Sequence, residues 1–335
     1  MNLFIKLRRR GFYMKTDIIT EGRKTRISTG YNESYWKRLS KSIMRNKSLY
    51  IMMLPVVAWY LIFHYGPMYG AIIAFKDFSP GLGIFGSKWV GLQNFVDFFQ
   101  SIHFERIFRN TIIISLSTII FGFPAPIILA LLINEIRSKR YKSIVQTSSY
   151  LPHFISMVVV CGMIKNFTNE TGIITYLLGF FGFNPQIMLN NADYFVPIYI
   201  ISDIWQSIGW NSIIYLAALA GINQELYEAA KIDGAGRWRQ TFHITIPGIL
   251  PTVMIMLILR MGGIMNVGHE KIILLYNPVT YETADVISSY VYRKGIKEAN
   301  FSYSTAVGLF NSVINFAFLI GSNKLSKKFN ETSLW

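Results

Sequence analysis

The segment TIIISLSTIIFGFPAPIILALLI, residues 111–133, contains no Asp, Glu, Lys or Arg. A helix that crosses the hydrocarbon layer of a bilayer needs roughly 20 mostly apolar residues, so this segment is long enough to span a membrane. The whole chain has a similar character, because its 335 residues are 52% hydrophobic and only 15% charged. The sequence therefore predicts an all-helical integral membrane protein, since a lone helix satisfies its own backbone hydrogen bonds in lipid.

Five further segments meet the same criterion, two of them with a single interruption. They are Ser48–Phe75, Ser143–Ile164, Tyr194–Gln224 (interrupted by Asp203), Gln240–His269 (interrupted by Arg260) and Ala299–Asn323. Another uncharged segment, Thr171–Ala192, has an apolar part of only about half a span, followed by Gly, Asn and Pro. We interpret it as interfacial or re-entrant rather than as a seventh span. The prediction is six membrane-spanning helices.

The distribution of basic residues supports six spans with both termini in the cytoplasm. With that topology, the cytoplasmic segments hold 23 of the 33 Lys and Arg residues, as the positive-inside rule requires. We expect a multi-pass protein of the plasma or inner membrane. Its predicted parts are a basic cytosolic tail at 1–47, a transmembrane domain at 48–323 and a cytosolic C-terminal tail at 324–335.

The basic tail has two interpretations, and Met14 is a second candidate start within it. It could bind nucleic acid or an effector, or it could anchor the topology on anionic membrane lipid. We favour the anchor and expect no nucleic-acid partner, because aromatic residues are not interleaved with the basic ones. On the opposite side, apolar residues from Leu92 to Phe108 recur at helical spacing, which predicts an amphipathic helix packed on the outer mouth or in the interface.

Catalytic and metal-binding patterns are missing from the sequence. The chain has one cysteine and five histidines, no phosphate-binding G-x-x-x-x-G-K-[ST] motif, and no second histidine after His269-Glu270 to complete a zinc motif. We therefore expect no enzyme activity, no metal and no cofactor bound by this chain.

The predicted cytoplasmic loop at 224–251 is the most informative polar segment. Glu225 to Asp233 predicts a short helix, and Gly234 is suited to end it in a left-handed turn. A second short helix should follow, with Trp238 and Phe242 on one face. The loop is therefore predicted to form a rigid projection on the cytosolic face.

This loop resembles the EAA loop of ABC importer permeases. The matching positions, in the spacing of that family, are Glu228, Ala229, Ala230, Gly234, Ile244 and Pro247. Ile246 stands where the family usually has Leu. The resemblance implies a coupling helix that docks on a separate ATPase.

Other segments, among them YGPMYGAIIAFKDFSP (65–80), NVGHEKIILLYNP (266–278) and AVGLFNSVIN (306–315), resemble LplB-type permeases of the MalF-like carbohydrate family. The resemblance covers about 280 residues. It implies the type I importer (MetI-like) architecture of six transmembrane helices and import of oligosaccharides or complex saccharides. It also implies four kinds of partner: a second homologous permease, two ATPase subunits that bind ATP and Mg, an extracellular sugar-binding lipoprotein and the saccharide itself.

The candidate substrate path rests on the two charges inside spans. Asp203 and Arg260 lie at similar depths, so they either pair with each other or line the path and contact sugar. Trp205, Gln206, Trp210 and Asn211 follow on the fourth span, and their rings and amides suit saccharides, although such residues also serve helix packing.

Two rival functions remain open. One is an ABC permease for another small solute. The other is a secondary transporter that works alone, which should carry more intramembrane carboxylates than the single Asp203.

Overall fold

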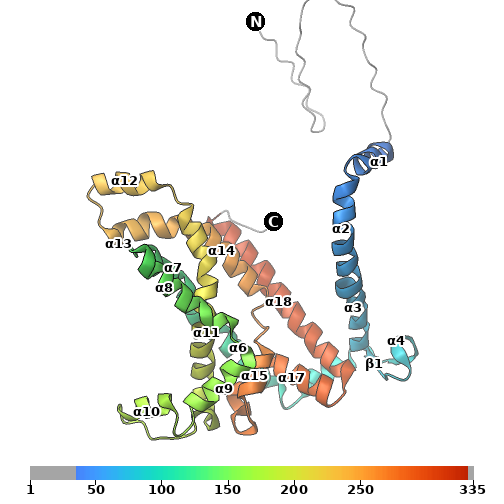
Figure 1. The fold of residues 1–335 in the computed structure, drawn as a ribbon. Helices are drawn as coiled ribbons and strands as arrows, with labels where there is room; N and C mark the ends of the chain where they lie inside the picture. The colour runs from blue at the N-terminus through green and yellow to red at the C-terminus, as the bar shows by residue number, and fades with distance from the viewer. Residues whose placement is uncertain (1–34, 331–335) are drawn as a thin grey trace, which may run out of the picture. The chain divides into compact units, whose positions relative to one another are not determined.

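The computed structural model describes residues 35–330, so the segments 1–34 and 331–335, which include most of the predicted N-terminal tail, lie outside the described residues. Contacts divide the chain into two compact units, Met1–His64 and Tyr65–Trp335. The described residues are almost entirely helical (Figure 1), and the strands among them are the antiparallel pair β1 (Lys76–Asp77) and β2 (Lys88–Trp89). Each unit is described by itself.

The first unit contains α1 (Tyr35–Arg45) and α2 (Lys47–Tyr60), after which the helix continues into a π-helical turn, Leu61–Tyr65. No residue of α2 is buried, although the helix is rich in Met, Leu and Val. An apolar helix with this exposure is suited to contact with lipid or with a helix of another subunit.

The second unit contains the remaining elements. In chain order they are α3 (Gly66–Met68), the 3-10 helix Tyr69–Phe75, β1, α4 (Gly83–Gly86), β2, α5 (Gln93–Gln100), α6 (Phe104–Ser117), the π turn Thr118–Gly122, α7 (Pro124–Asn134), α8 (Lys139–Tyr150), the 3-10 turn Leu151–Phe154, α9 (Met157–Phe167), α10 (Ile173–Gly179), the 3-10 turn Met188–Asn190, α11 (Ala192–Ala220), α12 (Gln224–Ile232), α13 (Arg237–Gln240), the π turn Thr241–Thr245, α14 (Ile246–Met261), α15 (His269–Leu275), the 3-10 turn Pro278–Thr280, α16 (Tyr281–Ala284), α17 (Ile287–Tyr292), the π turn Arg293–Lys297 and α18 (Phe301–Asn330).

Four helical segments are long and apolar enough to cross a membrane, namely Lys47–Phe75, Phe104–Asn134, Arg237–Met261 and Phe301–Lys328. The bent pair Lys139–Phe154 and Met157–Phe167 makes a fifth span if it is counted as one. Helix α11 has the length of a span, 29 residues, but is not in this set. Its middle carries Asp203, Gln206 and Asn211, which lower its apolar content.

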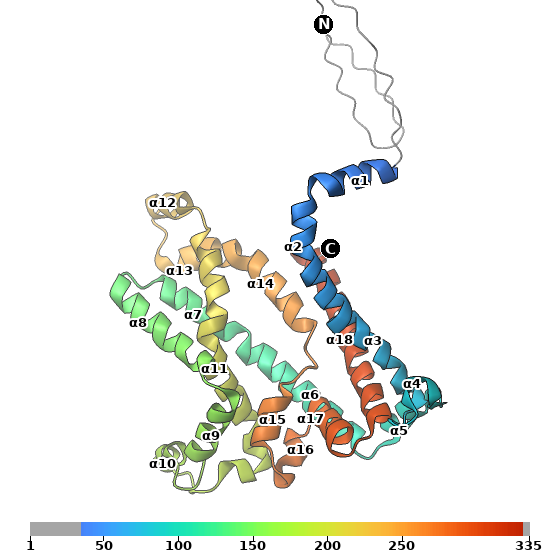
Figure 2. The same ribbon diagram turned by 45° about the vertical axis from the view of Figure 1, so that its right-hand side comes forward.

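Helix α11 is the central element of the second unit. It packs against α7, α8, α14 and α16, and Figure 2 shows it passing among these helices. Asn191 caps its start by accepting a hydrogen bond from the Asp193 backbone at 2.9 Å. At Gly209 an added Cβ would collide with the backbone carbonyl of Ser149, so the lack of a side chain there allows α8 to approach α11 closely.

The third predicted span, Ser143–Ile164, is not one straight helix. The chain bends by 100° between its two halves. Ile155 is extended at the bend, and the Ser156 hydroxyl accepts a hydrogen bond from the Val159 backbone at 3.4 Å to begin α9. A capping serine starts a helix rather than continuing one, so the third predicted span is broken near its middle.

Two other predicted helices end earlier than expected. The fifth span stops at Met261 rather than His269, because Gly262 and Gly263 follow and open a loop. The amphipathic stretch from Leu92 to Phe108 is broken at Ser101 into α5 and the start of α6. Its packing on the bundle is confirmed, because Phe98 is fully buried with its ring 5.4 Å from that of Phe310 on α18.

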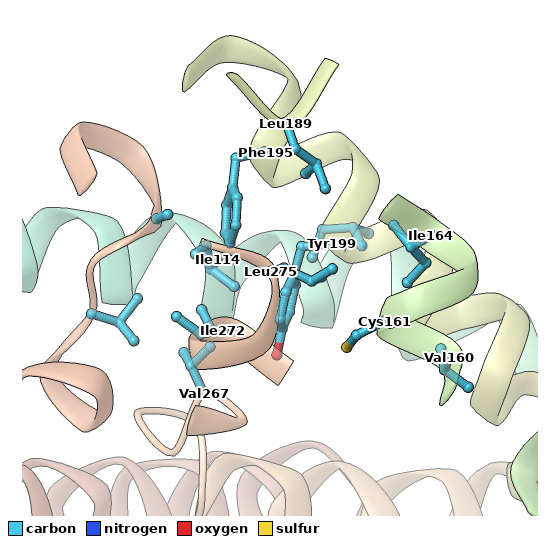
Figure 3. Packing of buried hydrophobic residues seen from close by; sticks show 13 residues of the cluster. Ile114, Val160, Cys161, Ile164, Leu189, Phe195, Tyr199, Val267, Ile272 and Leu275 are labelled. Atoms are coloured by element: carbon cyan, nitrogen blue, oxygen red, sulfur yellow. The ribbon is translucent and has the colours of Figure 1, made fainter. Parts of the chain in front are cut away.

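The largest buried cluster joins α11 to the segment that follows α14. Figure 3 shows Phe195 and Tyr199 of α11 beside Ile272 and Leu275 of α15, with Ile114 behind them. Cys161 and Ile164 of α9 pack on the other side of Tyr199. This cluster fixes the residues between the fifth and sixth spans against the central helix.

Candidate functional site

A cavity of about 510 Å³ lies within the second unit, along the middle of α11 from Tyr199 to Tyr215 and beside the last turns of α14. Its wall comes from α6 and α7 with the turn between them, from α11, from the end of α14, and from the loop after Gly262. The polar lining residues are Ser115, Thr118, Tyr199, Asp203, Ser207, Asn211, Tyr215, Arg260 and Asn266. The cavity is large enough for a small ligand and offers mixed polar and apolar contacts.

Asp203 and Arg260 both line this cavity, but they do not pair with each other. The Asp203 carboxylate lies 3.7 Å from the Nζ of Lys271, a side chain that is only 2% exposed. Lys271 also donates a hydrogen bond to the Tyr199 carbonyl at 3.2 Å and lies 4.7 Å from the centre of that ring. The structure therefore has no Asp203–Arg260 ion pair and places both residues beside the cavity, and their contact with sugar stays a prediction.

Lys271 was missed by sequence reasoning because it follows the fifth span in a segment predicted to be extracellular. Burial lowers the pKa of Lys271, whereas the nearby Asp203 carboxylate acts to raise it. The burial of a lysine is tolerated here because a carboxylate, a carbonyl and an aromatic face surround its ammonium group.

The other α11 candidates divide between the cavity and the protein interior. Asn211 lines the cavity. Gln206 is buried and donates a long hydrogen bond, 3.5 Å, to the Ile155 carbonyl at the bend before α9. The ring of Trp210 stacks on His153 at 4.6 Å with an angle of 4° between the planes. Gln206 and Trp210 therefore support helix packing, and Trp205, half exposed, is not among the cavity residues.

The buried carboxylate of Asp285 fixes the position of residues 269–298, the segment between the fifth and sixth spans. Asp285 is fully buried and accepts from Arg293 at 2.7 Å and from Arg106 at 3.3 Å. Its second oxygen accepts from the Ser289 hydroxyl at 2.9 Å. Arg106 belongs to α6 and the other partners to α17 and the turn after it, so this cluster ties the second span to the segment that supplies Lys271.

The predicted projection is present between the end of α11 and the start of α14 (Figure 1). Helix α12 begins at Gln224, where the Asn223 side chain accepts a hydrogen bond from the Glu225 backbone at 3.0 Å. It ends before Gly234, which has φ +74° as the sequence predicted. Helix α13 follows, and the rings of Trp238 and Phe242 lie on one face, 6.3 Å apart.

The projection is attached to the bundle by a few polar contacts. The Tyr227 hydroxyl lies 3.0 Å from that of Thr245, and Arg237 lies 3.8 Å from the Glu135 carboxylate at the end of α7. Ile244 is half-buried, and Pro247 lies in the first turn of α14, where a missing N–H is tolerated.

The outward face of the projection is exposed. Glu228 and Ala229 are exposed, and Ala230 is partly so. Ile232 and Trp238 are 87% and 78% exposed, which is unusual for such large apolar side chains. An exposed apolar patch beside small residues is typical of a docking surface. Among residues 35–330, no cluster of three His, Cys, Asp or Glu is suited to hold a metal ion.

Comparison with known proteins decides the family. The family described as "Binding-protein-dependent transport system inner membrane component" matches residues 122–330, which include both the cavity and the projection. The chain belongs to this family. It is thus a membrane component of a binding-protein-dependent transport system, and the expectation of a transport subunit agrees with that membership.

Two individual relatives are similar in sequence to this chain over most of their length. The chain is 44% identical to protein LplB of Bacillus subtilis (strain 168) over 295 residues, which cover 88% of this chain and 93% of LplB. It is 43% identical to the polygalacturonan/rhamnogalacturonan transport system permease protein YteP of the same organism over 300 residues, 89% and 94% of the two chains.

Two solved structures are also similar to this chain over most of its length. A chain of a bacterial ABC transporter involved in the import of the acidic polysaccharide alginate matches with a TM-score of 0.81 and 46% identity, covering 88% of this chain and 99% of that one. A second structure of a bacterial alginate ABC transporter, in complex with a periplasmic protein that holds an alginate pentasaccharide, matches with a TM-score of 0.82 and 45% identity, covering 89% and 100%. The predicted LplB-type resemblance and permease fold class are confirmed.

Proposed function

We propose that this chain is a permease subunit of an ATP-driven ABC importer for oligosaccharides, and specifically for acidic ones. The observation that carries the proposal is the position of two features in one helical unit. A polar cavity lies along the middle of α11 and at the end of α14, and an exposed projection connects the end of α11 to the start of α14. The names of the similar proteins, with polygalacturonan and alginate as cargo, support the acidic class.

The partners in this proposal are a second homologous permease, two ATPase subunits and an extracellular sugar-binding protein. ATP and Mg would bind on the ATPases, since this chain has no phosphate-binding loop of its own. One relative in the solved structures is bound to a periplasmic protein with its sugar, which supports delivery by such a partner. Both chain termini would lie in the cytoplasm with the projection.

The projection transmits motion in this mechanism. Glu228, Ala229 and Ala230 would enter a groove on the ATPase, where small side chains allow close approach. When the ATPases close on ATP, α12 moves with its groove, and α11 and α14, which connect directly to the projection, move with it. From Ile246 to Arg260 the helix α14 spans roughly 20 Å at about 1.5 Å per residue, so a shift at the projection reaches the cavity through one rigid element.

The test is Gly234→Asp, which places a charge and a side chain at the exposed turn of the projection. We expect oligosaccharide uptake in reconstituted vesicles, and the ATP hydrolysis that the loaded binding protein stimulates, to fall to background while the protein remains in the membrane. Gly81→Asp is the matched control, because Gly81 also has open space around it and lies in the segment between the first two spans. Normal uptake by the Gly234→Asp variant would refute the coupling assignment.

A further inference from the structure

Two charged side chains line the cavity, and only one of them lies beside a group of opposite charge. Asp203 and Arg260 are the charged residues among those that line it, and Asp203 lies 3.7 Å from the buried Lys271. That carboxylate is therefore neutralised from within the protein. Arg260 has no such compensation: within residues 35–330, no carboxylate lies within 4 Å of its guanidinium group, and no hydrogen bond from that group is formed. Counting the buried Lys271 beside the wall, two cationic groups face one carboxylate, so the net charge around the cavity is positive.

An uncompensated guanidinium in a membrane-embedded cavity is costly, because little water is present to solvate it. Arg260 belongs to the last turn of α14 and is exposed toward the cavity rather than buried among side chains. Its position leaves its planar set of donors open to a ligand. A carboxylate is the ligand group that fits such a guanidinium with two parallel hydrogen bonds.

Three hydroxyl groups of the wall are free to accept hydrogen bonds, because their own protons are already donated. The hydroxyl groups of Ser115, Thr118 and Ser207 donate to the backbone carbonyls of Ile264, Ile114 and Asp203, at 2.6, 2.8 and 2.7 Å. Their oxygen lone pairs remain free for the hydroxyl groups of a sugar. The charged donor that the wall offers is Arg260, so an anionic group of the sugar would be directed to this one position.

We propose that Arg260 is the residue that selects acidic over neutral saccharides in this permease, by pairing with a carboxylate of the sugar inside the cavity. The proposal rests on the proposed function and deepens it, because it assigns the specificity to one side chain. Lys271 and Asp203 do not take part in this selection. They form an internal pair that positions α15 against α11 at the edge of the cavity.

The test compares an acidic trisaccharide, trigalacturonate, with its carboxyl-reduced neutral counterpart. Binding of each to the purified assembled transporter is measured without the binding protein, and ATP-driven uptake into vesicles is measured with it. In the Arg260→Gln variant we expect binding and uptake of trigalacturonate to fall about tenfold to a hundredfold, the usual effect of losing one charged hydrogen-bond pair. The neutral sugar should change by less than about twofold.

Two further variants separate specificity from structure. Arg109→Gln is the matched control, because it makes the same change at an exposed arginine that is not among the residues lining the cavity. It should behave as the original protein. Arg260→Lys keeps the charge without the planar donor set and should lie between the original protein and Arg260→Gln.

Several outcomes would overturn the proposal. Equal losses for both sugars in Arg260→Gln, no loss for either, or failure of both Arg260 variants to assemble would show that the arginine has another role. If the original transporter takes up the neutral sugar as well as the acidic one, selection at Arg260 is wrong while the importer function stands. If it takes up neither sugar with ATP, the proposed function itself is wrong.

Discussion

At the scale of single residues, two glycines occupy positions where another residue would be disfavoured, Gly234 by its backbone angle and Gly209 by lack of space. Gly234 in the projection has φ +74°, whereas the nearby Gly236 has φ −69°, and neither has an atom within 4 Å of an added Cβ. Substituting each of these two glycines therefore measures the cost of the backbone angle alone, because a collision of the added Cβ is absent in both.

We predict that Gly234→Ala destabilises the turn by about 1–2 kcal/mol, the usual cost of the left-handed conformation for an L-residue. Gly236→Ala should have almost no effect. Hydrogen exchange of residues 225–240 measures this, and faster exchange is expected only for Gly234→Ala. Equal exchange in the two variants would mean that the turn does not need the left-handed residue.

Gly209 is the second position. Because an added Cβ would collide with the Ser149 carbonyl, we predict that Gly209→Ala forces α8 and α11 apart and destabilises the protein by about 1–3 kcal/mol, as overpacking usually does. The control is Gly308→Ala on α18, where nothing lies within 4 Å and alanine is the better helix former. Thermal unfolding of the purified protein in detergent should show a lower Tm for the first variant alone.

At the scale of elements, the Asp285 cluster holds α17 to the second span. We predict that Asp285→Asn loosens the segment 269–298, because two partly buried guanidinium groups lose their carboxylate. Breaking such a buried pair costs about 3–5 kcal/mol, and the partial exposure of Arg106 and Arg293 reduces this figure.

The matched control is Glu298→Gln, which removes a carboxylate from an exposed pair with Lys294 and should cost about 1 kcal/mol or less. Hydrogen exchange of residues 269–298 distinguishes the two variants. Slow exchange of this segment in Asp285→Asn would show that the cluster does not position it.

At the scale of the whole molecule, the orientation of the chain can be tested with single cysteines. The one native cysteine, Cys161, is buried, so background labelling should be low. We predict that a membrane-impermeant maleimide labels Phe85→Cys in intact cells, whereas it labels Trp238→Cys only after the membrane is opened. Labelling of Trp238→Cys in intact cells would place the projection outside and remove any contact with an ATPase.

Features that depend on local chemistry could be predicted from the order of the residues. A mostly apolar segment of about 20 residues without charge predicts a helix that can cross a membrane, and the glycine at 234 predicted its left-handed turn. The resemblance to the EAA loop also predicted the projection, because it depends on particular residues at fixed positions along one short segment.

Features that depend on residues far apart in the chain could not be predicted before the folded arrangement was known. Lys271 neutralises Asp203 across 68 positions of sequence, and no local pattern indicates that a segment after the fifth span returns to α11. The same holds for the Gln206 contact at the helix bend. The charge that a cavity presents to a ligand depends on which ionised groups the fold brings together, and those distances do not exist until the helices pack.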